Sequence, residues 1–274
     1  MYKAPTSFLA WTLKFIFSLT AFPLSAVAQT WPNKPIKIVA PFPPGGSVDQ
    51  VSRILAQQLT LQTGQPVIVE NRGGGSGSIG TGVVAKSAPD GYTFVVVFDT
   101  HAVNPSLIPN MPFDTVKDLS PIMLIGTSPM VLVAHKDSPY KNFGDVVKAA
   151  KDSKGSVQYG SISSGSLAHL AMTQLAATAK TEFTHVPYKG GGPLMQDAIA
   201  GHIRLSMGSA FLVALHVASG RVRPIAVTSA KRYVKYPDVP TIAESGYKGF
   251  DAPAWWGILA PAGMPLSLKA QMHN

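Results

Sequence analysis

Short apolar runs alternate with helix-like patterns of apolar and polar residues from residue 36 onward. Unbroken apolar runs such as 94–98 (FVVVF) are typical of strands whose two sheet faces are both covered. Apolar residues spaced three to four apart, as at Val48, Val51, Leu55 and Leu59, predict an amphipathic helix. The pattern predicts strands over residues 36–40, 67–69, 94–98, 157–160, 183–188, 203–207 and 225–228, and helices beginning near residues 47, 79, 145, 166, 193 and 211.

Repeated strand–helix units with right-handed crossovers predict an α/β fold with doubly wound, parallel-rich sheets. Two segments break the alternation. Residues 121–134 hold two apolar runs without a helix between them, and residues 255–259 form another such run. We interpret both as crossings between two lobes with a cleft between them. The expected division is lobe 1 from 29–127 plus 250–274, and lobe 2 from 128–249.

The first 28 residues have the pattern of a cleaved export signal. Lys3 and Lys14 precede the apolar run 15–26, and Ala26 and Ala28 are the small residues that a signal peptidase reads. The alternative is a membrane anchor, but the apolar stretch is shorter than the roughly 20 residues that a span needs and contains Pro23. We therefore expect an exported protein cleaved after Ala28.

Composition narrows the function classes. The 274 residues include 25 Gly and 23 Pro, and their combined share is well above the usual Gly plus Pro share of roughly 12%. Charged residues make up only 14% of the chain. Cysteine is absent, which excludes disulfides, Cys-ligated metals and thiol catalysis. Losing Lys3 and Lys14 with the signal lowers the net charge from +9 to +7. The basic residues within 221–235 are loosely spaced and lack an interleaved run of aromatic residues, so no nucleic-acid partner is expected.

The glycine excess falls largely in four turns between a predicted strand and the next helix. These glycine-rich turns are 41–47 (PFPPGGS), 71–78 (NRGGGSGS), 160–166 (GSISSGS) and 188–193 (YKGGGP). Ligands of open α/β sheets bind at such strand ends, and bare backbone amides at helix starts attract anions. One helix terminus contributes about 0.3–1 kcal/mol to an exposed anion, whereas micromolar binding needs about 8 kcal/mol. The two lobes are therefore expected to close on an anion together.

Local signals mark where several of these helices begin and end. Ser47 and Gln50 are spaced as a capping box, which predicts that the first helix starts at Ser47. Pro193 suits the first position of a later helix, and Gly201 suits the position just after its end.

Enzyme signatures are mostly missing: the sequence lacks G-x-S-x-G, the G-x-x-x-x-G-K-[ST] phosphate loop and H-E-x-x-H. Gly75, Gly77 and Gly80 do match G-x-G-x-x-G, with Asp99 at the end of the next strand. This leaves an exported dinucleotide-binding enzyme as an alternative, although four residues separate the strand from the motif. No two of the seven histidines are four apart, and neither a metal site nor catalytic residues are expected.

Single polar and aromatic residues allow two interpretations each. His101 either faces the cleft or bonds to local backbone, and His169 is expected to pack as a neutral ring rather than to act in catalysis. Asp49 either supports the helix start or meets a ligand ammonium or a water. Trp255 and Trp256 are expected in the core or between the lobes.

A series of short segments runs along the whole chain from residue 41 onward. The opening segment PFPPGG at 41–46, with Asp49 and Arg53, is followed by 69–75 (VENRGGG), 88–93 (APDGYT), 101–105 (HAVNP), 186–190 (VPYKG), 226–229 (AVTS), 237–241 (PDVPT), 243–246 (AESG) and 260–263 (APAG). In these segments and their order the chain resembles the Bug-type substrate-binding proteins, the extracytoplasmic receptors of tripartite tricarboxylate transporters.

The resemblance implies a periplasmic, two-lobed "Venus flytrap" that binds a small organic carboxylate and contacts membrane transporter subunits transiently. Sensing instead of transport is an alternative. The resemblance further implies a non-enzymatic monomer without a cofactor. Backbone amides and ordered water would hold the ligand at Phe42, Gly45, Asp49, Gly77, Ser78, Thr100, His101, Ser161, Gly165, Ser166 and Gly190. The chain ends at 268–274, just inside a helix where family members continue, so a less stable lobe 1 is expected.

Overall fold

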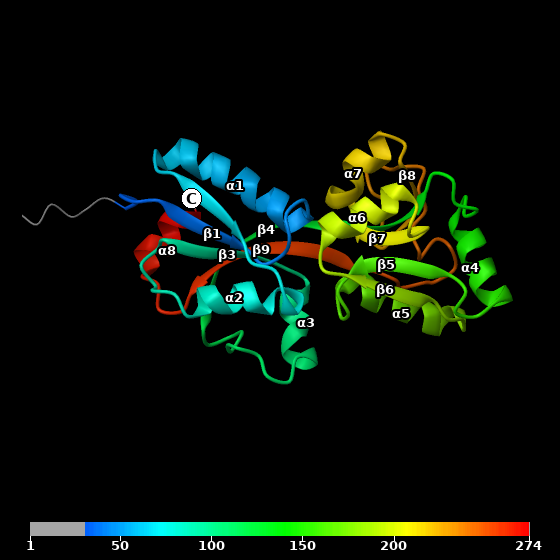
Figure 1. Ribbon diagram of the computed structural model, residues 1–274, viewed down its shortest axis with the longest axis horizontal. Helices are drawn as coiled ribbons and strands as arrows, with labels where there is room; N and C mark the ends of the chain where they lie inside the picture. Colours follow the sequence, from blue (N-terminus) through cyan, green and yellow to red (C-terminus); the bar gives the residue numbers. More distant parts are fainter. Residues whose placement is uncertain (1–30, 274) are drawn as a thin grey trace, which may run out of the picture. The chain divides into compact units, whose positions relative to one another are not determined.

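The computed structural model describes residues 31–273, and the predicted export signal at 1–28 lies outside them. Residues 32–273 belong to one compact unit. It holds two sheets that share one strand, with helices between the strands (Figure 1). Within the described range, no helix is both long enough and apolar enough to cross a membrane.

The sheet of lobe 1 has the strand order β2-β1-β3-β9-β4. Strands β1, β2 and β3 are parallel, whereas β9 is antiparallel to β3 and β4 is antiparallel to β9. Chain connections move in opposite directions from β1 to β2 and from β2 to β3, so right-handed crossovers place α1 and α2 on opposite faces (Figure 1). The elements are β1 Ile36–Ala40, α1 Ser47–Thr63, β2 Val67–Asn71, the 3-10 turn η1 Gly75–Gly77, α2 Ser78–Ala85, β3 Thr93–Phe98, α3 Thr100–Leu107, β9 Pro253–Pro261 and α8 Leu266–His273.

The sheet of lobe 2 has the order β4-β7-β5-β6, and β8 pairs with the other edge of β4. Strands β5, β6 and β7 are parallel, and β4 is antiparallel to β7 and to β8. The elements are α4 Phe143–Asp152, β5 Gln158–Ile162, α5 Leu167–Ala179, β6 Thr184–Tyr188, α6 Gly191–Ala200, β7 Leu205–Ser209, α7 Ala210–Ala218 and β8 Val222–Val227.

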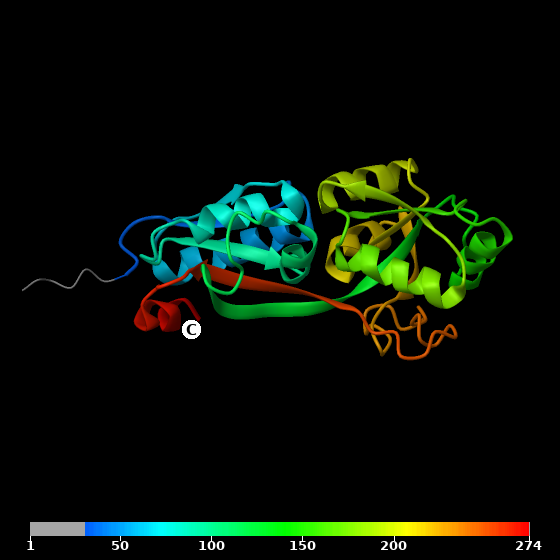
Figure 2. The ribbon, with the colours of Figure 1, turned by 90° about the horizontal axis from the view of Figure 1, so that it is seen from below.

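One strand belongs to both sheets. The two apolar runs predicted within 121–134 form the single 17-residue strand β4, Leu119–His135. Residues 119–129 of β4 pair with β9, and residues 130–135 pair with β7 and β8. The expected crossing is confirmed, and Figure 2 shows β4 and β9 running side by side between the lobes.

Thr228, directly after β8, ties the two long strands together where they leave lobe 2. Its hydroxyl accepts a hydrogen bond from Met130 N at 3.0 Å and donates one to Ala252 O at 2.7 Å. Its backbone N and O bond to the same two residues. Because Thr228 is fully buried, these four bonds join β8, β4 and the start of β9 away from water.

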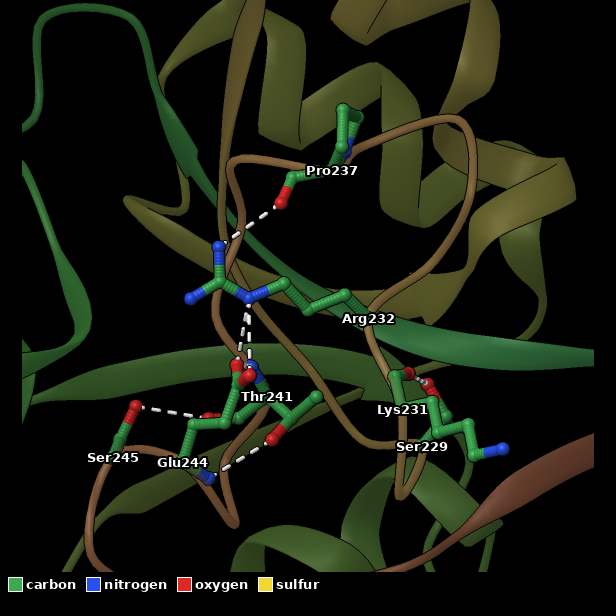
Figure 3. Close-up of polar contacts among 7 residues, drawn as sticks. All are labelled: Ser229, Lys231, Arg232, Pro237, Thr241, Glu244 and Ser245. Atoms are coloured by element: carbon green, nitrogen blue, oxygen red, sulfur yellow. Dashed lines mark hydrogen bonds and ion pairs between the residues drawn. The ribbon is translucent and has the colours of Figure 1, made fainter.

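The segment between β8 and β9 is held by a compact polar network (Figure 3). Arg232 Nε donates to both carboxylate oxygens of Glu244, at 3.1 and 2.8 Å, and its guanidinium also donates to Pro237 O. Glu244 and Thr241 cap each other, since each backbone N donates to the other's side-chain oxygen at 2.9 Å. Arg223 likewise donates to carbonyl oxygens of its own lobe, so these two arginines stabilise the fold.

Two local predictions need correction, and a third is confirmed. Helix α1 does begin at Ser47, but its N-cap is Gly46, which has no side chain, so the predicted capping box does not form. Gly45 N donates to Asp49 Oδ2 at 3.0 Å. Pro193 is the third residue of α6, not the first. Gly201 does end α6 in the left-handed conformation, with φ of 81°.

The apolar periodicity did not predict one short helix, α3. Pro105 lies inside it, and proline normally argues against a helix interior. In a helix of eight residues Pro105 stands near the end, where few intrahelical bonds are lost.

Candidate functional site

The glycine-rich turns 41–47 and 188–193 come from different lobes and touch each other. A Cβ atom placed on Gly192 would lie 2.3 Å from Pro44 O, and one on Gly46 would lie 3.3 Å from Gly191 N. A Cβ atom placed on Gly190 would lie 2.8 Å from the ring of Pro43. Glycine is needed at this contact because any side chain would push the two backbones apart.

Two cavities flank this contact. The inner one has a volume of about 10 Å³, room for a single water at most, and is lined mainly by apolar side chains. Phe42, Val48 and Phe98 line it from lobe 1, and Ile162, Met207 and Leu212 line it from lobe 2. The outer one is a groove of about 480 Å³, lined by Pro43, Gly73, Gly74, Gly75, Ser76, Gly77, Ser163, Pro187, Tyr188 and Lys189. The outer groove has the volume of a small-molecule site, whereas the inner cavity is too small for one.

Two serines in this groove hold strained backbone conformations. Ser76 in lobe 1 has φ of 53° and Ser163 in lobe 2 has φ of 52°, and the only other described non-glycine residue with positive φ is Lys180. Such strain costs about 1–3 kcal/mol and gathers at functional sites. The sequence prediction named neighbours of both serines but neither serine itself. Ser76 stands between Gly75 and Gly77, which was an available signal, whereas Ser163 stands between Ile162 and Ser164 and had no signal of this kind.

The first turn of α5 carries one backbone amide that bonds to lobe 1. The Ser166 hydroxyl caps the helix by accepting from His169 N at 3.3 Å, and Gly165 N donates to His169 Nδ1 at 3.1 Å. The next amide, Leu167 N, donates across the lobe boundary to Asp99 Oδ1 at 3.2 Å. A carboxylate therefore occupies the position that an anion would take at this helix start.

Asp99 is the most perturbed acidic group among the described residues. Burial raises its pKa to about 7, against the lowering effect of backbone amides that include Leu167 and Thr100. Its second oxygen, Oδ2, is buried and has no hydrogen-bond partner. The dinucleotide alternative would need this carboxylate for a ribose, whereas here it bonds to lobe 2.

Five of the predicted ligand residues lie where the lobes meet. The ring of Phe42 packs against Gly77, and Gly45 lies opposite Gly192. Gly165 faces Leu107 of α3, and Gly190 faces Pro43. These five residues contribute backbone atoms and close packing at the place where the lobes meet.

Three other predicted ligand residues have their polar or aromatic groups engaged within one lobe. Asp49 accepts hydrogen bonds from Gly45 N, Arg53 and Asn71. Burial alone would raise its pKa, but the bonds from Arg53, Gly45 and Asn71 outweigh it, and the pKa lies below the usual value. His101 stacks on Phe113 with ring centroids 6.2 Å apart, and burial lowers its pKa to about 4.

The third of these residues, Ser161, contacts a pair of stacked histidines next to turn 160–166. Its hydroxyl lies 2.8 Å from His185 Nε2, and the rings of His185 and His169 stack at 4.2 Å. Burial, aided by His169, lowers the pKa of His185 to about 4, and burial lowers that of His169 too. Both rings are therefore neutral at pH 7, as expected for His169, and they support the turn from below.

The remaining predicted residues are buried at helix starts. Ser78 begins α2 and Thr100 begins α3, while Ser166 caps α5. Trp256 packs on Phe98 of lobe 1 and Phe211 of lobe 2, with centroids 5.1 and 6.1 Å away, which confirms the expected interface position. Among residues 31–273 no group of three His, Asp or Glu side chains is arranged to hold a metal ion.

Two α/β lobes joined by long strands, with glycine-rich strand ends meeting between them, define a two-lobed solute-binding protein. The sequence profile described as "Tripartite tricarboxylate transporter family receptor" matches residues 51–274. The chain belongs to this family of receptors.

Known relatives agree with this assignment. Protein BugT of Bordetella pertussis is 38% identical over 245 residues, covering 89% of this chain and 74% of the relative. The R. palustris protein Rpa4515, solved with adipate, superposes with a TM-score of 0.85 at 32% identity, over 88% of this chain and 81% of that one. MatC of Rhodopseudomonas palustris, solved with malate, has a TM-score of 0.81 at 29% identity, over 88% and 82%.

Proposed function

We propose that this chain is a periplasmic receptor that captures a small organic carboxylate between its lobes and delivers it to the membrane subunits of a tripartite tricarboxylate transporter. The observation that carries the proposal is the direct contact of glycine-rich turns from both lobes beside a groove that ends at helix starts. The carboxylates bound to Rpa4515 and MatC support it.

In the proposed complex, carboxylate oxygens accept hydrogen bonds from backbone amides at the starts of α2, α5 and α6. Lys189 adds a cation at the groove. Amides at helix starts are preorganised donors, so little energy is lost in ordering them. The predicted ligand residues, from Phe42 in lobe 1 to Gly190 in lobe 2, keep this role in the proposal.

The proposed mature protein starts after Ala28 and acts as a monomer, without a cofactor and without catalysis. Lobe 1 comprises 29–127 and 250–274, and lobe 2 comprises 128–249. Closure brings both lobes onto one ligand, which supplies the binding energy that a single helix start cannot.

A thermal-shift measurement on the purified mature protein tests carboxylate capture. A di- or tricarboxylate at a hundred times its Kd is expected to raise Tm by roughly 5 °C or more, because it binds only the folded state. The methyl esters of the same acids are the matched control, since they lack the negative charge, and they should leave Tm unchanged. Well-folded protein that responds to none of the acids would contradict the proposal.

A further inference from the structure

The two buried aspartates of lobe 1 differ in how their oxygens are satisfied. Asp49 and Asp99 are each only 4% exposed. Both oxygens of Asp49 accept hydrogen bonds, from Gly45, Arg53 and Asn71. Asp99 receives one from Leu167 N on Oδ1, and its Oδ2 receives none. Contacts within the protein therefore satisfy both carboxylate oxygens of Asp49 but only one carboxylate oxygen of Asp99.

An unsatisfied buried acceptor destabilises the folded state, and a charged one does so more than a neutral one. Native proteins rarely keep such a group unless a ligand, a water or a function uses it. The position of Asp99 favours a ligand. Its chain neighbour Phe98 lines the inner cavity, and its partner Leu167 follows turn 160–166, whose Ile162 and Ser163 line the two cavities.

We propose that Asp99 Oδ2 accepts a hydrogen bond from the bound ligand, so that the receptor selects carboxylates that carry a hydroxyl or ammonium group beside the carboxylate. This inference rests on the proposed function and names its ligand class. The proposed function places the ligand carboxylate beside the start of α5, where Asp99 already accepts a hydrogen bond from Leu167 N. Two carboxylates this close repel each other unless a donor lies between them.

The charge of Asp99 fits this role. Burial brings its pKa to about 7, so the ionised form is well populated at neutral pH and gains from an added donor. An ammonium group both donates and neutralises the charge, whereas a hydroxyl only donates. A plain dicarboxylate offers neither and leaves Oδ2 buried without a partner.

Titration calorimetry at pH 7.5 with acids of one carbon skeleton tests the selection. The probes are succinate, L-malate and L-aspartate, which differ only in carrying hydrogen, hydroxyl or ammonium, and the matching series glutarate, 2-hydroxyglutarate and glutamate. In the wild-type protein, the donor-bearing acid of the series that binds is expected to bind at least about tenfold more tightly than the plain diacid.

Asp99→Asn removes the charge and adds an amide donor that can bond to a carboxylate. It should reduce the preference to less than about threefold, mainly by strengthening the plain diacid. Asp90→Asn, which removes an exposed charge that pairs with Lys34, is the control and should keep the wild-type preference.

Equal binding of a plain diacid and its donor-bearing counterpart by the wild-type protein would overturn the proposal, and this comparison needs no variant to fold. A preference that persists in folded Asp99→Asn would overturn it as well. If no acid of either series binds to folded protein, the proposed function fails and this inference falls with it, an outcome distinct from unselective binding.

Discussion

At the scale of single residues, Gly192 shows how the cleft depends on the absence of a side chain. It is the second residue of α6, where alanine would normally favour the helix by about 1 kcal/mol. Yet its missing Cβ is what lets Pro44 O approach from the other lobe. Because a backbone carbonyl cannot rotate away as a side-chain tip can, the whole lobe would have to move.

Gly192→Ala is therefore expected to separate folding from binding. Tm should stay unchanged or rise slightly, while affinity for the tightest-binding carboxylate should fall at least about tenfold because the lobes cannot close fully. Calorimetric titration and a thermal melt measure the two effects. Gly126→Ala, at a glycine of β4 with open space around it, is the control and should leave affinity intact. Wild-type affinity in Gly192→Ala would show that this contact is not required for capture.

Sequence reasoning located the turn around Gly192 but not its partner. The glycine-rich turns 41–47 and 188–193 are both visible in the sequence, whereas their mutual contact is not. Similarly, Asp99 and Leu167 are 68 positions apart, and no local signal pairs them.

At the scale of elements, β4 and β9 provide the connection on which both sheets depend. Thr228 bonds to residues of both segments through its hydroxyl and its backbone. The apolar pattern predicted a crossing at 121–134 but divided it into two runs. Pairing with a neighbouring strand, here β9, then β7 and β8, made it continuous.

Thr228→Val keeps the shape of the side chain but removes its hydroxyl, leaving Met130 N and Ala252 O short of a partner in a buried place. The free energy of unfolding is expected to fall by about 2–4 kcal/mol. Urea denaturation followed by circular dichroism measures it. Thr228→Ser retains the hydroxyl and should lose less than half as much. Equal losses in the two variants would assign the effect to the methyl group and contradict the role of the hydrogen bonds.

At the scale of the whole molecule, the shared strand predicts that the two sheets unfold together. Because β4 pairs in both sheets, unfolding of this strand in one sheet also removes its pairing in the other. Local opening of one lobe therefore destabilises both lobes. Thermal unfolding without ligand is expected to be one transition, with coincident curves from far-ultraviolet circular dichroism and from tryptophan fluorescence, which reports on Trp255 and Trp256 in β9. Two separated transitions would show that the lobes are independent folding units.

The amino-acid sequence alone was enough to predict the alternation of strands and helices, the glycine-rich turns at strand ends and the resemblance to the receptor family. These are local properties, set by side-chain periodicity and backbone freedom within a few residues. Helix α3 was missed because Pro105 obscures a helix that packing nevertheless supports.

The contacts between turns, the strain at Ser76 and Ser163, and the buried oxygen of Asp99 without a partner are visible only in the folded chain. The physical reason is that contact and burial depend on how β4 and β9 bring distant segments together. Periodicity reports which face of an element is apolar, but not what that face or its end will meet.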